Sequence, residues 1–448
     1  MDQYLDMPLL GFFFRIRKIR QQLARIRQEI AMSKEELQTY QLAKLKRVMA
    51  SAYERVPLYR DKWKAAGVQP DDLRTLNDLE KFPIVTKEEF RNLDLDKLIT
   101  GGKNGKDYHL FRTTGSSGIP VSMLYDRDKG FYEIAEISTF SINMHFNLNL
   151  KKGMSILLLD EDAMEILPMM EFPHVRKMLF DALDTVENHI RQINRIRPDY
   201  LVTYPSVLKN IALKAQAEGI LVHQPRLLFT TGESHDDHTR KIIRDVFKGE
   251  VLDGYASTET GIMAVECPMH SGLHVIDYKI LMEIVDDRHC LVPPGRSGNV
   301  IVTDLNNLML PVIRYAGLGD ISAYRPEPCT CPRKALPLLS RVEGRKMDAF
   351  ILPGNKVLHP FHLTTLMLDV ADIRKFQIRQ EKKDEIRVLI VRQPVRDKVS
   401  GDHEYAKLKE RFHALVGSDV SVRFEFVDDI CRDESSHKIP TVVSLVRQ

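Results

Sequence analysis

The chain has 448 residues, 43% of them hydrophobic and 28% charged, a composition typical of a folded globular protein with two or three domains. Its 65 basic and 62 acidic residues leave a formal net charge of +3, which gives no reason to expect a nucleic-acid partner. Five cysteines, an odd number in a long chain, disfavour a secreted disulfide framework and indicate reduced thiols in a cytoplasm.

Residues 1–100 are predicted to be mainly helical, with apolar residues at helical spacing from Leu37 to Tyr53 and near Leu73 to Phe90. No apolar run reaches the roughly 20 residues that span a bilayer. The basic stretch Arg15–Arg27 has two readings. We favour a solvated helix that packs its isoleucine and leucine side chains onto the body. The alternative is a basic amphipathic helix in peripheral contact with an anionic membrane surface.

Between about residues 105 and 325, short β-rich runs alternate with helical ones, which predicts an α/β domain with helices covering a sheet. The expected strands are Met154–Leu159, Tyr200–Tyr204, Leu227–Thr231, Val251–Tyr255 and Val300–Thr303, and the clearest helices are Glu187–Ile196 and Asp236–Phe247.

The last hundred residues have an α+β pattern of the size of a small separate domain. Ile373–Gln380 and Glu385–Arg392 are predicted to form a hairpin, Tyr405–Val416 a helix and Val420–Phe426 another strand. We place the boundary near Arg345 to Asp348, which divides the chain into a domain of residues 1–347 and one of residues 348–448.

A run rich in glycine and hydroxyl residues stands out in the first part of the α/β region. It reads Thr113-Thr114-Gly115-Ser116-Ser117-Gly118, with Ile119 and Pro120 after it. Glycines permit a tight turn whose N–H groups converge on an anion, and the hydroxyls add donors for phosphate oxygens. The Walker spacing and its lysine are missing. Alone, the run fits an ordinary surface turn equally well.

Further motifs follow in order along the chain: Asp253–Gly261, Arg314–Asp320, Gly344–Asp348 and Ser435–Pro440, with Val56–Arg60 and Phe82–Lys87 before them. From about residue 35 onward, their order and spacing resemble the adenylate-forming superfamily of acyl-CoA synthetases. The branch most similar is the phenylacetate–CoA ligase-like one, including relatives linked to capsular polysaccharide biosynthesis. The resemblance implies a large N-terminal adenylate-forming domain and a small, mobile C-terminal domain.

The resemblance also implies ATP-dependent activation of a small carboxylic acid to an acyl adenylate, with roles for individual residues. Residues 113–118 would hold the phosphates of ATP, and Glu259 would bind Mg²⁺, a hard cation that prefers oxygen ligands. Asp320 would accept from the ribose hydroxyls, and Arg345 would bond ribose or phosphate. The remaining nucleotide contacts would come from Gly232, Glu233, Tyr255, Ala256, Ser257 and Thr258, with Tyr255 stacking on adenine.

Lys438 is the expected catalytic cation, placed to stabilise charge that develops between the acyl carboxylate and the α-phosphate. Asp348 would be the hinge on which the C-terminal domain turns between two half-reactions. The sequence departs from the family pattern at two places, because His437 stands where glycine is usual and Ile119 where many relatives carry lysine.

Three readings of the second step stay open. Transfer to coenzyme A is favoured, transfer to a carrier-protein thiol or an amine is the alternative, and a degenerate nucleotide-binding homologue is a third reading that the surroundings of Lys438 support. An aryl acid is implied by resemblance, with Phe140, Tyr204 and Thr231 as plausible pocket linings. A homodimer is the default expectation for an enzyme of this kind.

A group of cysteine and histidine residues suggests a second metal site. Cys329 and Cys331 stand two residues apart, and Cys267 is followed by His270 and His274. Three thiols and one imidazole could close a tetrahedral structural Zn²⁺ site, as similar cysteines in some members of the branch suggest. Reduced thiols without a metal are the equal alternative, and the choice between His274 and His270 stays open.

Overall fold

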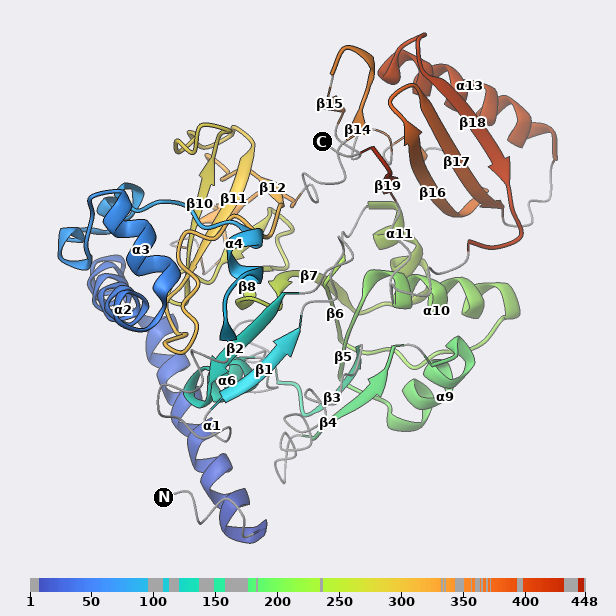
Figure 1. The fold of residues 1–448 in the computed structure, drawn as a ribbon. Helices are drawn as coiled ribbons and strands as arrows, with labels where there is room; N and C mark the ends of the chain where they lie inside the picture. The colour runs from blue at the N-terminus through green and yellow to red at the C-terminus, as the bar shows by residue number, and fades with distance from the viewer. Residues whose placement is uncertain are drawn as a thin grey trace. The chain divides into compact units, whose positions relative to one another are not determined.

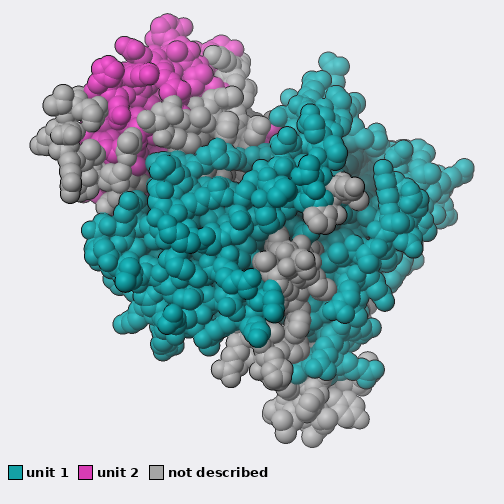
Figure 2. Space-filling model, turned by 180° about the vertical axis from the view of Figure 1, so that it is seen from behind, with its two compact units in different colours: residues 1–318, 322–342 teal, residues 319–321, 343–448 magenta. Residues whose placement is uncertain are grey.

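The structure is a computed structural model, and its chain divides into two compact units (Figure 2). Unit 1 comprises Met1–Leu318 with Ser322–Val342, and unit 2 comprises Gly319–Ile321 with Glu343–Gln448. The described residues are 8–95, 108–112, 121–136, 149–157, 176–182, 184–233, 237–331, 333, 336–342, 350–355, 357–358, 363, 366–367, 370, 372–392, 398–430 and 442–446.

The N-terminal part of unit 1 is helical, as the apolar spacing predicted. Its elements are α1 (Pro8–Ala31), α2 (Lys34–Arg55), α3 (Pro57–Ala65), the 3₁₀ turns η2 (Pro70–Asp72) and η3 (Leu76–Lys81), and α4 (Lys87–Arg91). Ser33 begins α2 through a reciprocal capping box with Glu36, which satisfies N–H groups that no helical carbonyl reaches. Pro57 begins α3, where a missing N–H costs nothing. None of the described helices is long and apolar enough to cross a membrane.

Helix α1 packs onto the body of unit 1 along one face. Ile19 and Ile26 are fully buried in a cluster with Phe131, Tyr132 and other residues of α6 (Arg127–Glu136), beside which α1 runs (Figure 1). The buried carboxylate of Glu29 accepts hydrogen bonds from the hydroxyls of Tyr40 and Tyr132 at 2.5 and 2.6 Å. The helix is therefore an integral part of the fold, as the favoured reading of the basic stretch expected.

The main sheet of unit 1 has eight strands in the order β13-β9-β8-β7-β6-β5-β3-β4. Parallel pairing joins β3 (Lys152–Leu157), β4 (Arg176–Asp181), β5 (Tyr200–Thr203), β6 (Leu227–Thr231) and β7 (Glu250–Ser257). Antiparallel pairing then adds β8 (Gly261–Glu266), β9 (Leu273–Val275) and β13 (Leu338–Leu339). The sheet is thus parallel at one side and antiparallel at the other.

Helices cover the parallel strands, whose side chains are buried on both faces. On one face lie α9 (Val186–Ile196), α10 (Pro205–Glu218) and α11 (Asp237–Val246) (Figure 1). They share a core with Leu201, Leu228 and Val251 of the strands. Alternate strand residues such as Val202 and Phe229 point to the other face, which α2 helps to cover. Burial on both faces explains why these strands read as continuous apolar runs.

Two smaller sheets complete unit 1. The hairpin β1 (Tyr108–Arg112) and β2 (Ser122–Asp126) pairs antiparallel, and β10 (Ile280–Val285), β11 (Gly298–Asp304) and β12 (Ile321–Ser322) form a three-stranded sheet. Strands β1, β2, β10 and β11 share the largest hydrophobic core of the unit with helices α2 and α3.

Unit 2 has an α+β architecture. Its elements are β14 (Phe350–Ile351), η7 (Pro353–Asn355), β15 (Val357–Leu358), β16 (Ile373–Lys382), β17 (Glu385–Arg392), α13 (Lys398–Val416), β18 (Ser421–Phe426) and β19 (Val442–Ser444). The four-stranded sheet has the order β18-β17-β16-β19, and Leu408 and Phe412 of α13 pack in one core with Ile378 and Val388 of the sheet. The hairpin lies where the sequence predicted it, whereas the helix begins at Lys398 instead of the predicted Tyr405.

Candidate functional site

The carboxyl ends of three neighbouring parallel strands carry residues that the sequence singled out. Tyr204 follows β5, Gly232 and Glu233 follow β6, and Ser257 ends β7 just before Glu259. Because β5, β6 and β7 pair in parallel register, these ends meet at one edge of the sheet. Open α/β sheets bind ligands at this kind of edge, particularly where strand order or direction changes, as it does between β7 and β8.

The loop after β6 is held against the start of α10. Glu233 accepts the backbone N–H of Ser206 at 3.0 Å and the Ser206 hydroxyl at 2.9 Å. A carboxylate at a helix N-terminus is stabilised by the exposed N–H groups there. Gly232 has a φ of 77°, a backbone conformation that glycine adopts without strain. This loop is thus fixed at the sheet edge next to Tyr204.

Glu259 lies in the tight turn between β7 and β8, and hydrogen bonds fix the turn on both sides of it. The Tyr125 hydroxyl donates to the carbonyl of Thr258 at 2.7 Å, and Lys129 Nζ donates to the carbonyl of Thr260 at 3.1 Å. The Tyr315 hydroxyl lies 3.4 Å from Glu259 Oε1. Glu259 as a whole residue is 6% exposed, so its position is set by the fold rather than by solvent.

A buried cluster of charges supports this turn from behind. Lys129, which is 1% exposed, bonds Glu133 at 2.6 Å and Asp304 at 2.8 Å. Lys279 reaches the other oxygen of Glu133 at 2.7 Å. Burial alone lowers the pKa of Lys129, but Asp304 and Glu133 raise it above its ordinary value, so the ammonium stays charged. At Gly261, φ is 76° and a Cβ would lie 2.0 Å from Glu133 Oε2, so a larger residue there would be strained and would displace the Glu133 carboxylate.

The Arg314–Asp320 motif is built into the fold next to the N-terminal Phe82–Lys87 motif. Val85 donates its N–H to the carbonyl of Arg314 at 2.9 Å and accepts from Ala316 at 2.9 Å. The buried Arg314 guanidinium bonds Glu283 at 2.8 Å and the carbonyl of Phe82 at 2.5 Å. These bonds place Tyr315, whose hydroxyl faces Glu259. Arg314 is therefore a structural residue that fixes its neighbour.

Other expected site residues are placed less completely. Tyr255, Ala256 and Ser257 are half-buried on β7, and the half-buried Asp320 directly precedes β12. The following expected residues lie outside the described part of the chain: Thr113, Thr114, Gly115, Ser116, Ser117, Gly118, Phe140, Arg345, Asp348 and Lys438. Residues 113–118, which the sequence predicts to bind phosphate, fall between the paired strands β1 and β2 in the chain.

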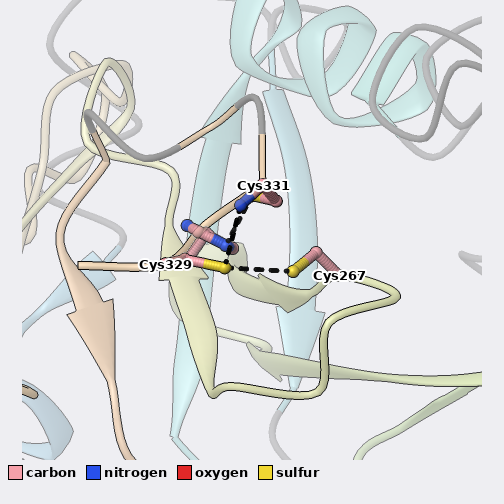
Figure 3. Close-up of side chains that lie close together, drawn as sticks. Cys267, Cys329 and Cys331 are labelled. Atoms are coloured by element: carbon pink, nitrogen blue, oxygen red, sulfur yellow. Dashed lines mark hydrogen bonds between the residues drawn. The ribbon is translucent and has the colours of Figure 1, made fainter. Parts of the chain in front are cut away.

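The structure brings three cysteines together (Figure 3), and His274 lies with them in one group. Cys267 follows β8, His274 lies on β9, and Cys329 and Cys331 lie in the segment that leads to β13. One ligand atom from each of the four lies within 4.8 Å of the other three. His274 belongs to this group, whereas His270 does not. Burial, and to a lesser degree the charge of Arg333, lower the pKa of His274 to about 4, so its imidazole is neutral near pH 7.

Comparison with known proteins adds sequence and structural relatives. Residues 350–444 match the CapK C-terminal domain family. The phenylacetate–coenzyme A ligase of Escherichia coli is 26% identical over 434 residues, covering 90% of this chain and 94% of the relative. The Thermus thermophilus enzyme of the same name is 24% identical over 419 residues, covering 87% and 92%. The solved 2-hydroxyisobutyryl-CoA ligase in its postadenylation state, bound to 2-HIB-AMP, has a TM-score of 0.75 at 19% identity, covering 90% and 89%.

These matches support the resemblance to the adenylate-forming superfamily that the motifs indicated. Within it, the relatives named phenylacetate–coenzyme A ligase support the resemblance to the phenylacetate–CoA ligase-like branch. The expected fold, a large α/β part followed by a small α+β part, is confirmed by the structural match.

The structure adds residues that the motifs did not identify. Tyr125, Lys129 and Asp304 support the Glu259 turn, yet they stand far from Glu259 in the sequence. Lys129 and Glu133 are spaced as an ordinary surface ion pair of a helix, so local spacing carried no signal of their burial. Tyr315 lies within the Arg314–Asp320 motif, and this position is the signal that could have identified it.

His270 takes part in a different network, beside the carboxyl-terminal end of β8. Its Nδ1 lies 2.8 Å from Glu266 and its Nε2 lies 2.8 Å from Glu250. Arg240 also bonds Glu266, at 2.9 Å. The network binds the turn after Cys267 to β7 and α11, and it occupies both ring nitrogens of His270.

Asp253, which donates its backbone N–H to Glu266 of this network, should make the stability of the protein depend on pH. Burial and the negative charge of Glu266 raise the pKa of Asp253 to about 7, against opposing contributions from Thr230 and Arg240. The folded state therefore keeps a proton that the unfolded chain releases near pH 4, so this contribution to stability is lost as pH rises from about 4 to about 7.

We expect Asp253→Asn to remove that contribution, worth up to about 1.4 kcal/mol per pH unit in this window. Urea unfolding of the wild type and the variant across the window measures the difference between their slopes. Parallel pH profiles would show that Asp253 titrates normally in the folded protein.

Proposed function

We propose that this chain uses ATP to convert a carboxylic acid to an acyl adenylate with release of pyrophosphate, and then transfers the acyl group to the thiol of coenzyme A. The observation that carries the proposal is the buried Glu259 carboxylate, held at the ligand-binding edge of the sheet by a turn anchored on both sides. Relatives named phenylacetate–coenzyme A ligase, aligned over most of both chains, support the same reaction class. Dependence on ATP, coenzyme A and reduced thiols suits a cytoplasmic enzyme.

The surroundings of Glu259 fit a magnesium ion. Among the described residues, its carboxylate has one hydrogen bond in the structure, the 3.4 Å contact from Tyr315 to Oε1, so most of its acceptor capacity is left for a ligand. Mg²⁺ prefers carboxylate and phosphate oxygens and would neutralise charge on the polyphosphate. Glu259 would hold this ion, and Tyr315 would keep the carboxylate oriented toward it.

In this proposal, the remaining contacts to ATP and to the reacting groups come from the residues that the family resemblance implied. Residues 113–118 would hold the phosphates with N–H and hydroxyl donors, and Asp320 would accept from the ribose hydroxyls. Tyr255 would cover the adenine face, flanked by Gly232 and Glu233. Arg345 would contact ribose or phosphate. Lys438 would stabilise the charge that develops as the acyl oxygen attacks the α-phosphate.

The C-terminal part of the chain would serve both half-reactions. With a hinge at Asp348, residues 348–448 would bring Lys438 to the nucleotide for adenylation and then turn away to admit the acyl acceptor. The structure divides into two compact units, and the second contains residues 343–448, which supports a separate role for the C-terminal part.

One observation favours an acyl acceptor other than coenzyme A. Residues 350–444 match the CapK C-terminal domain family, and in this proposal the C-terminal domain governs access of the acceptor. Transfer to an amine or to a carrier-protein thiol, as in polysaccharide or secondary-metabolite biosynthesis, is therefore the alternative to coenzyme A.

The test is pyrophosphate release from Mg–ATP across a panel of aryl, fatty, hydroxy and amino acids, with and without coenzyme A. Acid-dependent release is expected, and Lys438→Ala should lower it by about 100-fold or more. Formation of a thioester with coenzyme A would identify the acceptor. Tight binding of ATP without release for any acid would contradict the proposal and favour a degenerate nucleotide-binding protein.

A further inference from the structure

The cluster of Cys267, His274, Cys329 and Cys331 lies apart from the Glu259 turn and has no part in the proposed chemistry. All four side chains are buried, with exposed fractions of 3%, 0%, 3% and 7% respectively. Water is thus excluded from a group of three thiols and one imidazole. We propose that these four residues bind one structural zinc ion, and that the site is independent of the adenylation reaction.

The distances within the cluster fit tetrahedral coordination. With Zn–S bonds of about 2.3 Å, tetrahedral ligand atoms lie about 3.8 Å apart. The Sγ atoms of Cys267 and Cys329 are 3.6 Å apart, and Cys331 Sγ lies 3.3 Å from His274 Nε2. The sulfur separation is far beyond the roughly 2.05 Å of a disulfide. Small movements of the side chains would therefore close four bonds around one ion.

Backbone N–H groups are already directed at two of the sulfurs. Cys331 donates its N–H to Cys329 Sγ at 3.4 Å, and Arg333 donates its N–H to Cys331 Sγ at 3.3 Å. Hydrogen bonds of this kind orient ligands and stabilise the thiolate form that binds metal. Three thiolates and one Zn²⁺ carry a net charge of −1, and the guanidinium of Arg333 is close enough to interact with Cys267 and Cys331. The backbone of the segment that carries Cys329 and Cys331 is therefore arranged to support two metal-binding thiolates.

The chemistry of the ligands selects zinc. Thiolate and neutral imidazole are ligands for Zn²⁺, whereas Mg²⁺ and Ca²⁺ require oxygen. Four protein ligands in a closed, buried site are typical of structural zinc, because a catalytic site keeps a position open for water. His274 supplies the fourth ligand, while both ring nitrogens of His270 are used by Glu250 and Glu266.

The proposed ion would fasten the antiparallel side of the main sheet. Cys267 directly follows β8, His274 lies on β9, and Cys329 and Cys331 precede β13, which pairs with β9 through only two residues. Gly272 allows β13 to approach closely, since a Cβ there would lie 2.1 Å from the carbonyl of Leu339. An edge strand this short contributes little by itself. Four bonds across more than sixty residues of sequence would hold it in place.

The first measurement is the metal content of the full-length protein purified without added metal or chelator. About one zinc ion per chain is expected by elemental mass spectrometry. Replacement with Co²⁺ should give the thiolate-to-metal charge-transfer band and the visible absorption of a tetrahedral sulfur-rich site. Removal of zinc should lower the melting temperature by at least about 5 °C. None of these readouts depends on a variant that might fail to fold or on catalytic activity.

Matched variants then assign the ligands. Cys329→Ser and His274→Ala should lose most of the bound zinc, whereas Cys290→Ser and His270→Ala should keep it, since Cys290 is exposed and His270 lies outside the cluster. Folding of each variant is checked by circular dichroism. A metal-free wild type that neither takes up Zn²⁺ or Co²⁺ nor gains thermal stability from them would overturn the proposal. Folded Cys329→Ser protein with undiminished zinc would do the same.

Discussion

Replacing Glu259 by glutamine should slow acid-dependent pyrophosphate release by about 100-fold or more at a fixed Mg–ATP concentration. The substitution preserves the shape of the side chain and removes the charge that would hold a hard cation. The turn itself should persist, because its anchors are the main-chain carbonyls of Thr258 and Thr260. Initial rates measured against Mg²⁺ concentration check the prediction, since a weakened metal site also raises the concentration of Mg²⁺ that is needed.

Glu250→Gln is the matched control for Glu259→Gln. Glu250 begins the same strand, β7, at the end away from the turn, and it bonds His270 rather than any residue of the expected nucleotide site. Its rate of pyrophosphate release should equal that of the wild type. An unchanged rate and an unchanged Mg²⁺ requirement in Glu259→Gln would remove Glu259 from the proposed metal site.

The parallel part of the main sheet could be predicted from the sequence because its strands are short apolar runs with helices between them. Leu227–Thr231 was predicted with the bounds that β6 has, and Val251–Tyr255 lies inside β7. The β17 strand of unit 2 also has its predicted bounds, Glu385–Arg392. In each case the signal is local, because burial of the strand requires apolar residues at consecutive or alternate positions.

The antiparallel side of the sheet could not be predicted in the same way. β9 has three residues and β13 has two, too few for any periodicity to be recognised. Their pairing depends on contacts between segments more than sixty residues apart. The choice between His270 and His274 stayed open at the sequence level for the same reason, since the partners that distinguish them, Glu250 and Cys331, are distant in the sequence.

The residues of the candidate site also differ in whether local sequence could predict them. The position of Glu259 at the sheet edge could be predicted because its motif directly follows a strand, and the ends of parallel strands meet at one edge. The residues that support its turn are distant in sequence: Lys129 lies on α6, and Asp304 ends β11. A lysine in a helix is read as a solvated side chain unless its buried partners are known.

Replacing Lys129 by methionine should lower the free energy of unfolding by about 3–5 kcal/mol, the second large effect that the structure predicts. Methionine fills similar space but leaves the buried Asp304 without the ammonium that lies 2.8 Å from it. The carbonyl of Thr260 also loses its donor, so the Glu259 turn should be less well held. Urea unfolding measures the first effect, and pyrophosphate release per folded molecule measures the second.

The variant Lys279→Met distinguishes a loss of protein stability from a loss of positioning of the Glu259 turn. Lys279 is equally buried and shares Glu133 with Lys129, but Lys129 is the one of the two that donates to the Glu259 turn. Both variants should be destabilised, and Lys129→Met should lose more activity per folded molecule. Adding Asp304→Asn to Lys129→Met should restore part of the stability, because the uncompensated charge is removed, without restoring activity. Equal losses of activity in the two lysine variants would mean that the cluster acts on stability alone.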